Sequence, residues 1–313
     1  MSSDKTSITA FAPATVANVA VGFDVLGFAL DAVGDTVTLK KTTDVGKIEI
    51  ESIKGLEGLP YDPAKNTATV GLVKMLQELG LPFGFKVSIE KGIPLSSGMG
   101  GSAASSVAAV VAANGFLPNS LSKSELLRFA LEGERAASGA IHADNVAPSL
   151  FGGLTLIRST DPIDVINIPY PKLFCVLIHP DIKVETKYAR SVLATHLSLH
   201  QFVQQSAHLA SFIAGCFQQD IELIKRSCKD FVIEEQRAHL IPGFYDVQNA
   251  ALKANALACS ISGSGPSIFA LAANKQDCEL IKDAMILAFN KNGISKLDSW
   301  ISPINQIGAR IIL

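Results

Sequence analysis

A run of glycine and serine residues stands directly before a segment of strong helix formers, and this arrangement could bind phosphate. Residues 94–101 read PLSSGMGG and residues 102–113 read SAASSVAAVVAA. Glycine lets the backbone approach a ligand closely, and unpaired N–H groups at a helix start lie at the positive end of the dipole. The run lacks the lysine of the GxxxxGK[ST] motif and does not match GxGxxG with a following acid. The run therefore predicts a phosphate-binding loop that belongs to neither motif. The alternative is that the glycines only allow helices to pack closely.

Glu134 is a candidate metal-binding carboxylate on a segment, residues 122–138, that the sequence predicts to be helical. Ser122 and Glu125 form a capping box at its start, and Gly139 follows its end. Four charged residues recur at spacings of three and four, as on one exposed stripe: Glu125, Arg128, Glu132 and Arg135. Glu134 instead shares its face with apolar residues. Its side chain is therefore expected to point inward.

An inward carboxylate must be paired or must bind a cation, because burying an isolated charge is costly. Mg²⁺ is commonly held by one or two carboxylates together with phosphate oxygens and water. Glu134, the hydroxyl of Ser102 and nucleotide phosphates could form such a shell. The alternative is a structural ion pair.

Two further segments place polar groups or bare backbone in unusual surroundings. Asn18 and Asp24 lie within a largely apolar stretch, residues 12–24, where polar side chains must find partners. Residues 262–267 (SGSGPS) form a second glycine loop, expected between two strands. Such a loop alone is usually a turn, although its backbone could also approach a ligand.

Composition limits the class of protein. The 313 residues carry 27 Lys and Arg against 29 Asp and Glu, so no bulk charge favours nucleic acid or an anionic membrane. With 48% hydrophobic and 18% charged residues, the chain is expected to be folded and soluble. No apolar run approaches the roughly 20 residues of a membrane span, and residues 1–5 lead into no signal core. The five cysteines lack a CxxC pair, which favours reduced thiols in a cytoplasm.

The elements that must position these residues are mixed in order. Period-2 alternation and β-rich composition predict strands within residues 8–39 and at 47–53, 86–90, 153–157, 173–178, 258–261, 267–272 and 309–313. Helical spacing predicts helices at 66–79, 102–113, 122–138, 186–194, 202–216, 220–231, 246–255 and 275–290, whereas 142–148 is expected to be irregular. Without a repeated strand-helix unit the fold class is α+β. A proline cluster divides the chain into domains 1–165 and 166–313.

Together these motifs resemble the GHMP kinase superfamily and, within it, the homoserine kinase family. Residues 12–24 resemble the family's APAxxANxGxGFD, residues 94–103 its PxxxGLGSSA, and residues 262–267 its C-terminal SGSGPS. The run GE…SG…HADNVAP…GG, residues 133–153, is similar to homoserine kinases rather than to their relatives. The chain departs from the family at Ala20, Val21, Met99 and Gly101, and the last replaces a serine that could contact phosphate.

The resemblance implies a two-domain GHMP kinase fold with a ribosomal-protein-S5-like N-terminal ATP-binding domain and a ferredoxin-like C-terminal domain. It implies ATP-dependent phosphorylation of the side-chain hydroxyl of L-homoserine, in threonine biosynthesis, by a cytoplasmic enzyme that uses Mg²⁺ and tends to form homodimers. Neither nucleic acid nor a membrane is an expected partner.

It also implies roles for individual residues. Adenine is expected near Asn66 and Thr67, and Mg²⁺ on Ser102 and Glu134. The residues expected around the phosphates are Pro94, Leu95, Ser96, Ser97, Gly98, Met99, Gly100, Gly101, Ser102 and Ala103. The residues expected around the amino acid are Asn18, Asp24, His142, Asn145, Arg190, Arg237 and Gly265.

A carboxylate calls for a forked guanidinium and an ammonium for a carboxylate, which the resemblance assigns to Arg190 with Arg237 and to Asp24. Taken alone, the charged helical segments that carry both arginines predict a solvated face. Asn18 and Asn145 match the residues that contact the hydroxyl.

Mevalonate kinase uses an aspartate base, whereas the resemblance implies that homoserine kinases need no strong base and that Asn145 orients the hydroxyl. Asp144 remains a candidate base, and His142 is expected to be a hydrogen-bonded wall. Two other functions stay open: a superfamily kinase acting on mevalonate or a sugar, and a silent nucleotide sensor. The sensor is disfavoured because Ser102 and Glu134 are both present.

Overall fold

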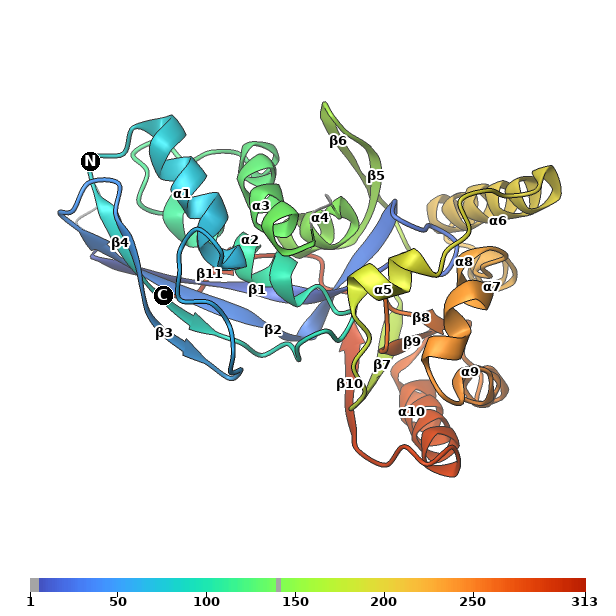
Figure 1. The fold of residues 1–313 in the computed structure, drawn as a ribbon. Helices are drawn as coiled ribbons and strands as arrows, with labels where there is room; N and C mark the ends of the chain where they lie inside the picture. The colour runs from blue at the N-terminus through green and yellow to red at the C-terminus, as the bar shows by residue number, and fades with distance from the viewer. Residues whose placement is uncertain (1–5, 139–141) are drawn as a thin grey trace.

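The computed structural model describes residues 6–138 and 142–313, whose strands form two sheets (Figure 1). The larger sheet has the order β11-β1-β2-β4-β3, and β5 joins it by pairing with β2 and with β6. The central strands β1 and β2 are antiparallel, and their register shifts between Pro13 and Thr15. The strands are β1 (Ser7–Ala17), β2 (Leu26–Thr42), β3 (Ile48–Lys54), β4 (Gly84–Glu90), β5 (Leu154–Thr160), β6 (Ile163–Ile168) and β11 (Arg310–Ile311).

The helices of the first half of the chain cover one face of this sheet (Figure 1). They are α1 (Thr67–Leu79), α2 (Gly101–Asn114), α3 (Lys123–Ser138) and α4 (Ala143–Phe151). The central helix α2 packs against both neighbouring helices and against β1 and β2. Its side chains are almost all alanine, serine or valine and are buried, because only small residues let so many neighbours approach one helix.

The second sheet has the order β10-β7-β9-β8 with antiparallel neighbours. Its strands are β7 (Phe174–Pro180), β8 (Ala258–Ile261), β9 (Ile268–Ala272) and β10 (Leu297–Pro303). The helices of this half are α5 (Thr186–Ser191), α6 (Leu199–Gln218), α7 (Ile221–Ser227), α8 (Ile233–Arg237), α9 (Phe244–Lys253) and α10 (Lys275–Lys291), with a short 3₁₀ turn, η1 (Ala238–Leu240).

The two halves of the chain pack against each other. Phe28 of β2 makes an edge-to-face contact with Phe269 of β9, with ring centroids 6.1 Å apart. The C-terminal segment returns to the larger sheet, where β11 pairs with β1. The expected boundary at residue 165 falls within β6, and the second sheet begins with β7 at Phe174. The division into two domains stays a prediction.

The α+β class and most of the predicted elements are confirmed, with ends shifted by one to a few residues. The expectation for residues 142–148 is wrong, because 143–151 form α4. Pro148 lies inside this helix, whose buried side chains include Val146, Ala147 and Leu150, so tertiary packing overrides the local effect of proline. Residue 139, expected to close α3, lies outside the described residues, as do residues 1–5. Across the described ranges, no helix is long and apolar enough to cross a membrane.

Candidate active site

A cavity of about 360 Å³ brings together most of the site residues expected from the sequence. Loops from both halves of the chain line it, so the fold joins segments that are far apart in sequence. The expected residues that line it are Asn18, Asp24, Asn66, Thr67, Pro94, Leu95, Ser96, Ser97, Gly98, Gly100, Gly101, Ser102, Glu134, His142, Asp144, Asn145, Arg190 and Arg237.

Three expected residues do not line the cavity. The side chains of Met99 and Ala103 are fully buried in the hydrophobic core. Gly265 packs close to Ile241 and Ile261 instead. The second glycine loop contributes Gly263 and Ser264 to the cavity. The cavity thus contains the expected loops but not these three residues, and their binding roles stay predictions.

Two glycines of the loop 94–101 have backbone conformations that favour glycine, with φ of 74° at Gly98 and 69° at Gly100. A Cβ on Gly98 would lie 2.3 Å from the carbonyl oxygen of Ser262, and one on Gly100 would lie 2.2 Å from Thr15 Oγ1. These glycines therefore allow other protein segments to pack against the loop, in addition to any ligand.

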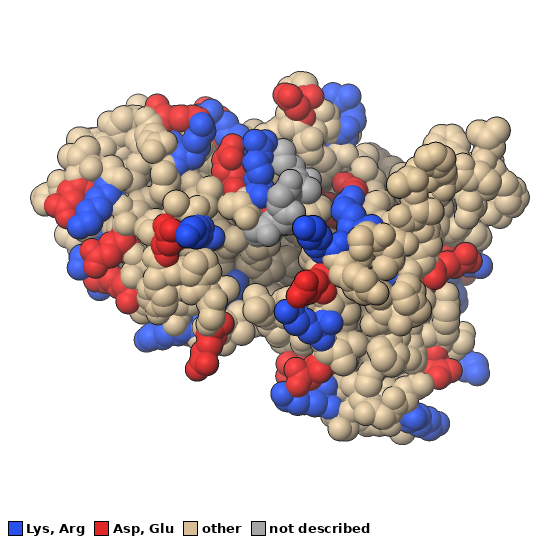
Figure 2. All heavy atoms as spheres, in the orientation of Figure 1, with Lys and Arg blue, Asp and Glu red and all other residues tan. Residues whose placement is uncertain are grey.

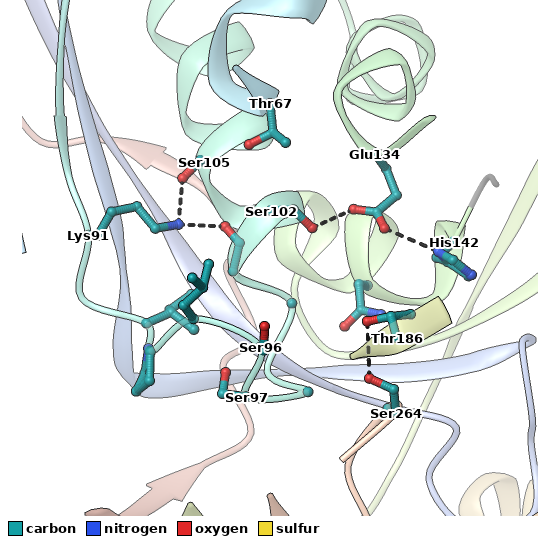
Figure 3. A pocket seen from close by; sticks show the side chains of 18 of the residues that line it. Thr67, Lys91, Ser96, Ser97, Ser102, Ser105, Glu134, His142, Thr186 and Ser264 are labelled. Carbon is teal, nitrogen blue, oxygen red and sulfur yellow. Dashed lines mark hydrogen bonds and ion pairs between the residues drawn. The ribbon is translucent and has the colours of Figure 1, made fainter. Parts of the chain in front are cut away.

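The two glycine loops are bonded to each other. Ser262 Oγ donates to the carbonyl oxygen of Gly98 at 2.8 Å, and the N–H of Ser267 donates to that of Ser97 at 3.3 Å. At the cavity wall, the hydroxyls of Thr186 and Ser264 lie 3.3 Å apart (Figure 3). The second glycine loop thus supports the first. Its sequence predicts a turn between two strands and does not reveal this role.

Glu134 points inward, as expected, and its carboxylate faces the first turn of α2 (Figure 3). Ser102 Oγ donates to Glu134 Oε2 at 2.7 Å, and Glu134 Oε1 lies 3.1 Å from His142 Nδ1. The hydrogen bond to Glu134 raises the pKa of His142 above its ordinary value. This arrangement matches the expected hydrogen-bonded wall at His142.

Asp144 and Asn145 begin α4 at the cavity. Thr15 Oγ1 donates to Asn145 Oδ1 at 2.7 Å, which fixes the orientation of the amide. Asp144 is 3% exposed, and its Oδ1 has no hydrogen-bond partner among the described residues. Burial, followed by the charge of Asp24, raises the pKa of Asp144 to about 7.

Asp24, Arg190 and Arg237 form a charged cluster in the cavity wall. Arg190 Nη2 donates to both carboxylate oxygens of Asp24, at 2.7 and 2.8 Å. Arg237 is 4% exposed and donates from Nε to the carbonyl oxygen of Ala189 at 2.9 Å. Burial, followed by the charge of Arg190, lowers the pKa of Arg237 to about 10, so it remains a cation at neutral pH. The solvated-face interpretation is therefore wrong for Arg237.

The side-chain amides of Asn18 and Asn66 both form hydrogen bonds with backbone groups. Asn18 Nδ2 donates to the carbonyl oxygen of Gly263 at 2.8 Å, and its Oδ1 accepts from the N–H of Asp24 at 3.1 Å. Asn66 Oδ1 accepts from the N–H of Ala68 at 3.0 Å and caps α1. Asn18 therefore joins the loop after β1 to the second glycine loop.

A buried ionic cluster beside the loop 94–101 was not predicted. Lys91 forms an ion pair with Asp35 and donates to Gly101 O and to Ser105 Oγ, both at 2.8 Å (Figure 3). Asp35 is fully buried and also accepts from Ser105 Oγ at 2.6 Å and from the N–H groups of Gly92 and Ile93. The sequence signal was a charged residue on the apolar side of an alternating strand.

The site offers hard oxygen donors for a cation. No group of three or more His, Cys, Asp or Glu suited to a metal ion occurs in the described part of the chain. Ser102 and Glu134 supply one hydroxyl and one carboxylate at the start of a helix, which fits Mg²⁺ that takes its remaining ligands from phosphate and water.

Comparison with known proteins identifies the family. Residues 66–153 match the GHMP kinases N terminal domain, and residues 212–291 match the GHMP kinases C terminal domain. The homoserine kinase of Chloroherpeton thalassium is 47% identical over 97% of this chain and 99% of its own length. The homoserine kinase of Xylella fastidiosa (strain M12) is 46% identical, over 97% and 93%.

Comparison with solved structures supports the same family. The crystal structure of homoserine kinase from Cytophaga hutchinsonii has a TM-score of 0.96 at 47% identity and covers 100% of this chain and 99% of its own. The L. major mevalonate kinase in complex with R-mevalonate has a TM-score of 0.69 at 14% identity over 97% of this chain, which shows the fold alone. The chain therefore belongs to the homoserine kinase family of the GHMP kinases.

Proposed function

We propose that the chain transfers the γ-phosphoryl group of ATP to the side-chain hydroxyl of L-homoserine and forms O-phospho-L-homoserine, which serves threonine biosynthesis. Membership of the homoserine kinase family supports this activity. The observation that carries it is one cavity that joins a glycine loop at a helix start to a cluster of two arginines and an aspartate.

The nucleotide lies along the loop 94–101, with its phosphates at the start of α2. Gly101 and Ser102 open this helix, whose N-terminal N–H groups favour an anion. Asn66 and Thr67, at the start of α1, border the adenine. Asn66 caps α1, so the start of this helix is a fixed surface against which a base can pack.

Ser102 Oγ and the carboxylate of Glu134 would hold Mg²⁺. The 2.7 Å contact between these two groups supports the pair, because both oxygens converge on one point at the helix start. When bound, the ion would neutralise phosphate charge and orient the transferred group. His142 holds the second carboxylate oxygen and keeps Glu134 in place.

The amino acid lies between the phosphates and the arginines. Arg190 and Arg237 bind its carboxylate, and Asp24 binds its ammonium group. Asn145, fixed by Thr15, orients the hydroxyl toward the γ-phosphoryl group. Positioning and charge neutralisation supply most of the catalysis, as in other phosphoryl transfers with little covalent chemistry for the protein to perform. Asp144 stands beside this hydroxyl as the alternative base.

A coupled assay of ADP release tests the function, with L-homoserine, L-threonine and mevalonate compared side by side. We expect turnover with L-homoserine to exceed that with the other two at least a hundredfold. A preference for mevalonate would assign the chain to another kinase of the superfamily, and no turnover with any acceptor would favour the nucleotide sensor.

We also propose a reducing compartment and a homodimeric assembly for this protein. All five cysteines are buried free thiols, which supports a reducing compartment such as the cytoplasm. Helix α6 supports a homodimer, because it carries no Asp, Glu, Lys or Arg, so its surface is tan in Figure 2. It also exposes Leu199, Phe202 and Val203. Analytical ultracentrifugation tests the assembly, and a concentration-independent monomer would contradict it.

A further inference from the structure

Two residues proposed to bind the two opposite charges of the substrate are bonded to each other. Asp24 lies in the loop after β1, and Arg190 lies at the end of α5, in the other half of the chain. The guanidinium of Arg190 contacts both carboxylate oxygens of Asp24 within 2.8 Å. Both side chains line the cavity and are about two-fifths exposed, at 39% for Asp24 and 42% for Arg190. The ion pair therefore occupies the place where the charges of an amino acid would bind.

The two arginines of this cluster are held differently. Arg237 is anchored by backbone, through the carbonyl oxygens of Ala189 and Gly263 at 2.9 and 3.1 Å. Arg190 instead directs its terminal nitrogen at the Asp24 carboxylate. The cluster thus contains a fixed cation and a cation whose partner can change.

The aromatic ring of Phe23 lies beside both guanidinium groups. Its centroid is 5.4 Å from the Arg190 guanidinium carbon and 5.2 Å from that of Arg237. An aromatic face attracts a guanidinium without taking its hydrogen-bond donors. Phe23 can therefore hold Arg190 near Arg237 while the donors of Arg190 change from one carboxylate to another.

We infer that an α-amino acid binds by exchange with this ion pair, and that the exchange makes the site specific for zwitterions. This inference rests on the proposed function. The carboxylate of the ligand takes Arg190 from Asp24, and its ammonium group takes Asp24 from Arg190, so both protein charges remain paired. A ligand with one charge breaks the same ion pair and leaves one partner without a counter-charge. Phe23 is then a positioning residue for specificity.

Exchange differs from independent subsites in one effect that depends on Arg190. If Asp24 served only the ammonium group, Asp24→Asn would strengthen a hydroxy acid only by removing a nearby like charge, and this gain would be the same in the Arg190→Gln background. Under exchange, the same substitution releases Arg190 from its internal partner, so a hydroxy acid binds more tightly while L-homoserine binds more weakly. Asparagine also suits the backbone at this position, where φ is 60°.

Calorimetric titration of the full chain with three ligands tests the inference. They are L-homoserine, 4-hydroxybutanoate, which lacks the amine, and 3-aminopropan-1-ol, which lacks the carboxylate. Asp24→Asn should weaken L-homoserine at least tenfold and strengthen 4-hydroxybutanoate at least threefold. Arg190→Gln should weaken L-homoserine similarly and strengthen 3-aminopropan-1-ol at least threefold. Asp164→Asn breaks an ion pair with Arg158 away from the cavity and should change none of the three affinities.

Unchanged or weaker binding of 4-hydroxybutanoate to Asp24→Asn would overturn the exchange, and so would an equal gain from Asp24→Asn in the Arg190→Gln background. Phe23→Leu should weaken L-homoserine about tenfold, and Phe23→Tyr should restore most of that loss, whereas equal losses in both variants would remove the ring from the inference. Turnover of L-homoserine by the wild type is measured separately. Its absence would contradict the proposed kinase activity, and the pattern of binding would still decide the exchange.

Discussion

The hydroxyl of Ser102 and the carboxylate of Glu134 are 2.7 Å apart, although 32 residues separate them in the chain. Ser102 belongs to the first turn of α2, and Glu134 projects from α3, which packs against α2. The helix start and the carboxylate therefore form one rigid unit. Any cation bound there has its protein ligands fixed before the nucleotide arrives, which lowers the cost of ordering them.

Glu134→Ala should lower turnover more than a hundredfold, because the proposed Mg²⁺ site loses its one protein carboxylate. The control is Glu132→Ala, two residues earlier on the same helix and away from the cavity, which should retain turnover within twofold. Turnover is measured over a range of Mg²⁺ concentrations, with thermal unfolding of each variant as a check of the fold. Nearly normal turnover of Glu134→Ala at saturating Mg²⁺ would remove this residue from the metal site.

Gly100→Ala and Gly101→Ala should differ sharply although the residues are neighbours. At Gly100 a Cβ would meet Thr15 Oγ1 at 2.2 Å and Asn145 Oδ1 at 2.8 Å, and φ is 69°. The substitution displaces Asn145, so we expect turnover to fall at least tenfold and KM to rise for both ATP and L-homoserine. At Gly101 the nearest atom is Ile93 Cγ2 at 3.2 Å, so Gly101→Ala should stay within about threefold. Similar kinetics for both variants would contradict this account.

The sequence predicted the loops of the site better than their contacts. The inward position of Glu134 is predictable because one carboxylate interrupts an apolar helical face, a signal that depends only on local periodicity. The sequence does not predict the bonds between the two glycine loops or the buried cluster of Asp35 and Lys91. These contacts join residues more than 50 positions apart, and no local pattern records which loop will face which. The α4 helix was missed for a related reason, since Pro148 argues against a helix and only its buried packing explains one.

Asp144→Asn distinguishes positioning from general-base catalysis. If positioning dominates, turnover should fall by about tenfold or less, whereas loss of a general base typically costs roughly 10² to 10⁴. We expect the smaller effect, with a turnover profile that stays flat between about pH 6 and 9. An inflection near pH 7 in the wild type that disappears in Asp144→Asn would instead identify Asp144 as the base, because its pKa lies at about 7.

The same carboxyl should make stability depend on pH. Burial raises its pKa from 3.8 to about 7 in the folded state, so the folded protein holds this proton at pH values where the unfolded chain has lost it. The contribution of Asp144 to stability is therefore complete below about pH 4 and is lost as the pH rises through 7. Urea unfolding of wild type and Asp144→Asn between pH 5 and 8 measures it. As the pH rises, the free energy of unfolding of the variant should increase relative to that of the wild type. A difference that does not depend on pH would contradict the raised pKa of Asp144.

Lys91→Met should destabilise the fold by about 3 to 5 kcal/mol, because it leaves the fully buried Asp35 without its counter-charge. The double variant Asp35→Asn, Lys91→Met should recover part of that loss, since no isolated charge remains. Lys91 also donates to Gly101 O, at the first turn of α2, so the cluster should hold the phosphate end of the site in place. In the folded double variant we therefore expect KM for ATP to rise at least fivefold and KM for L-homoserine to change less than twofold. Urea unfolding and the two KM values check both parts, and equal changes in the two KM values would reduce the cluster to a structural ion pair.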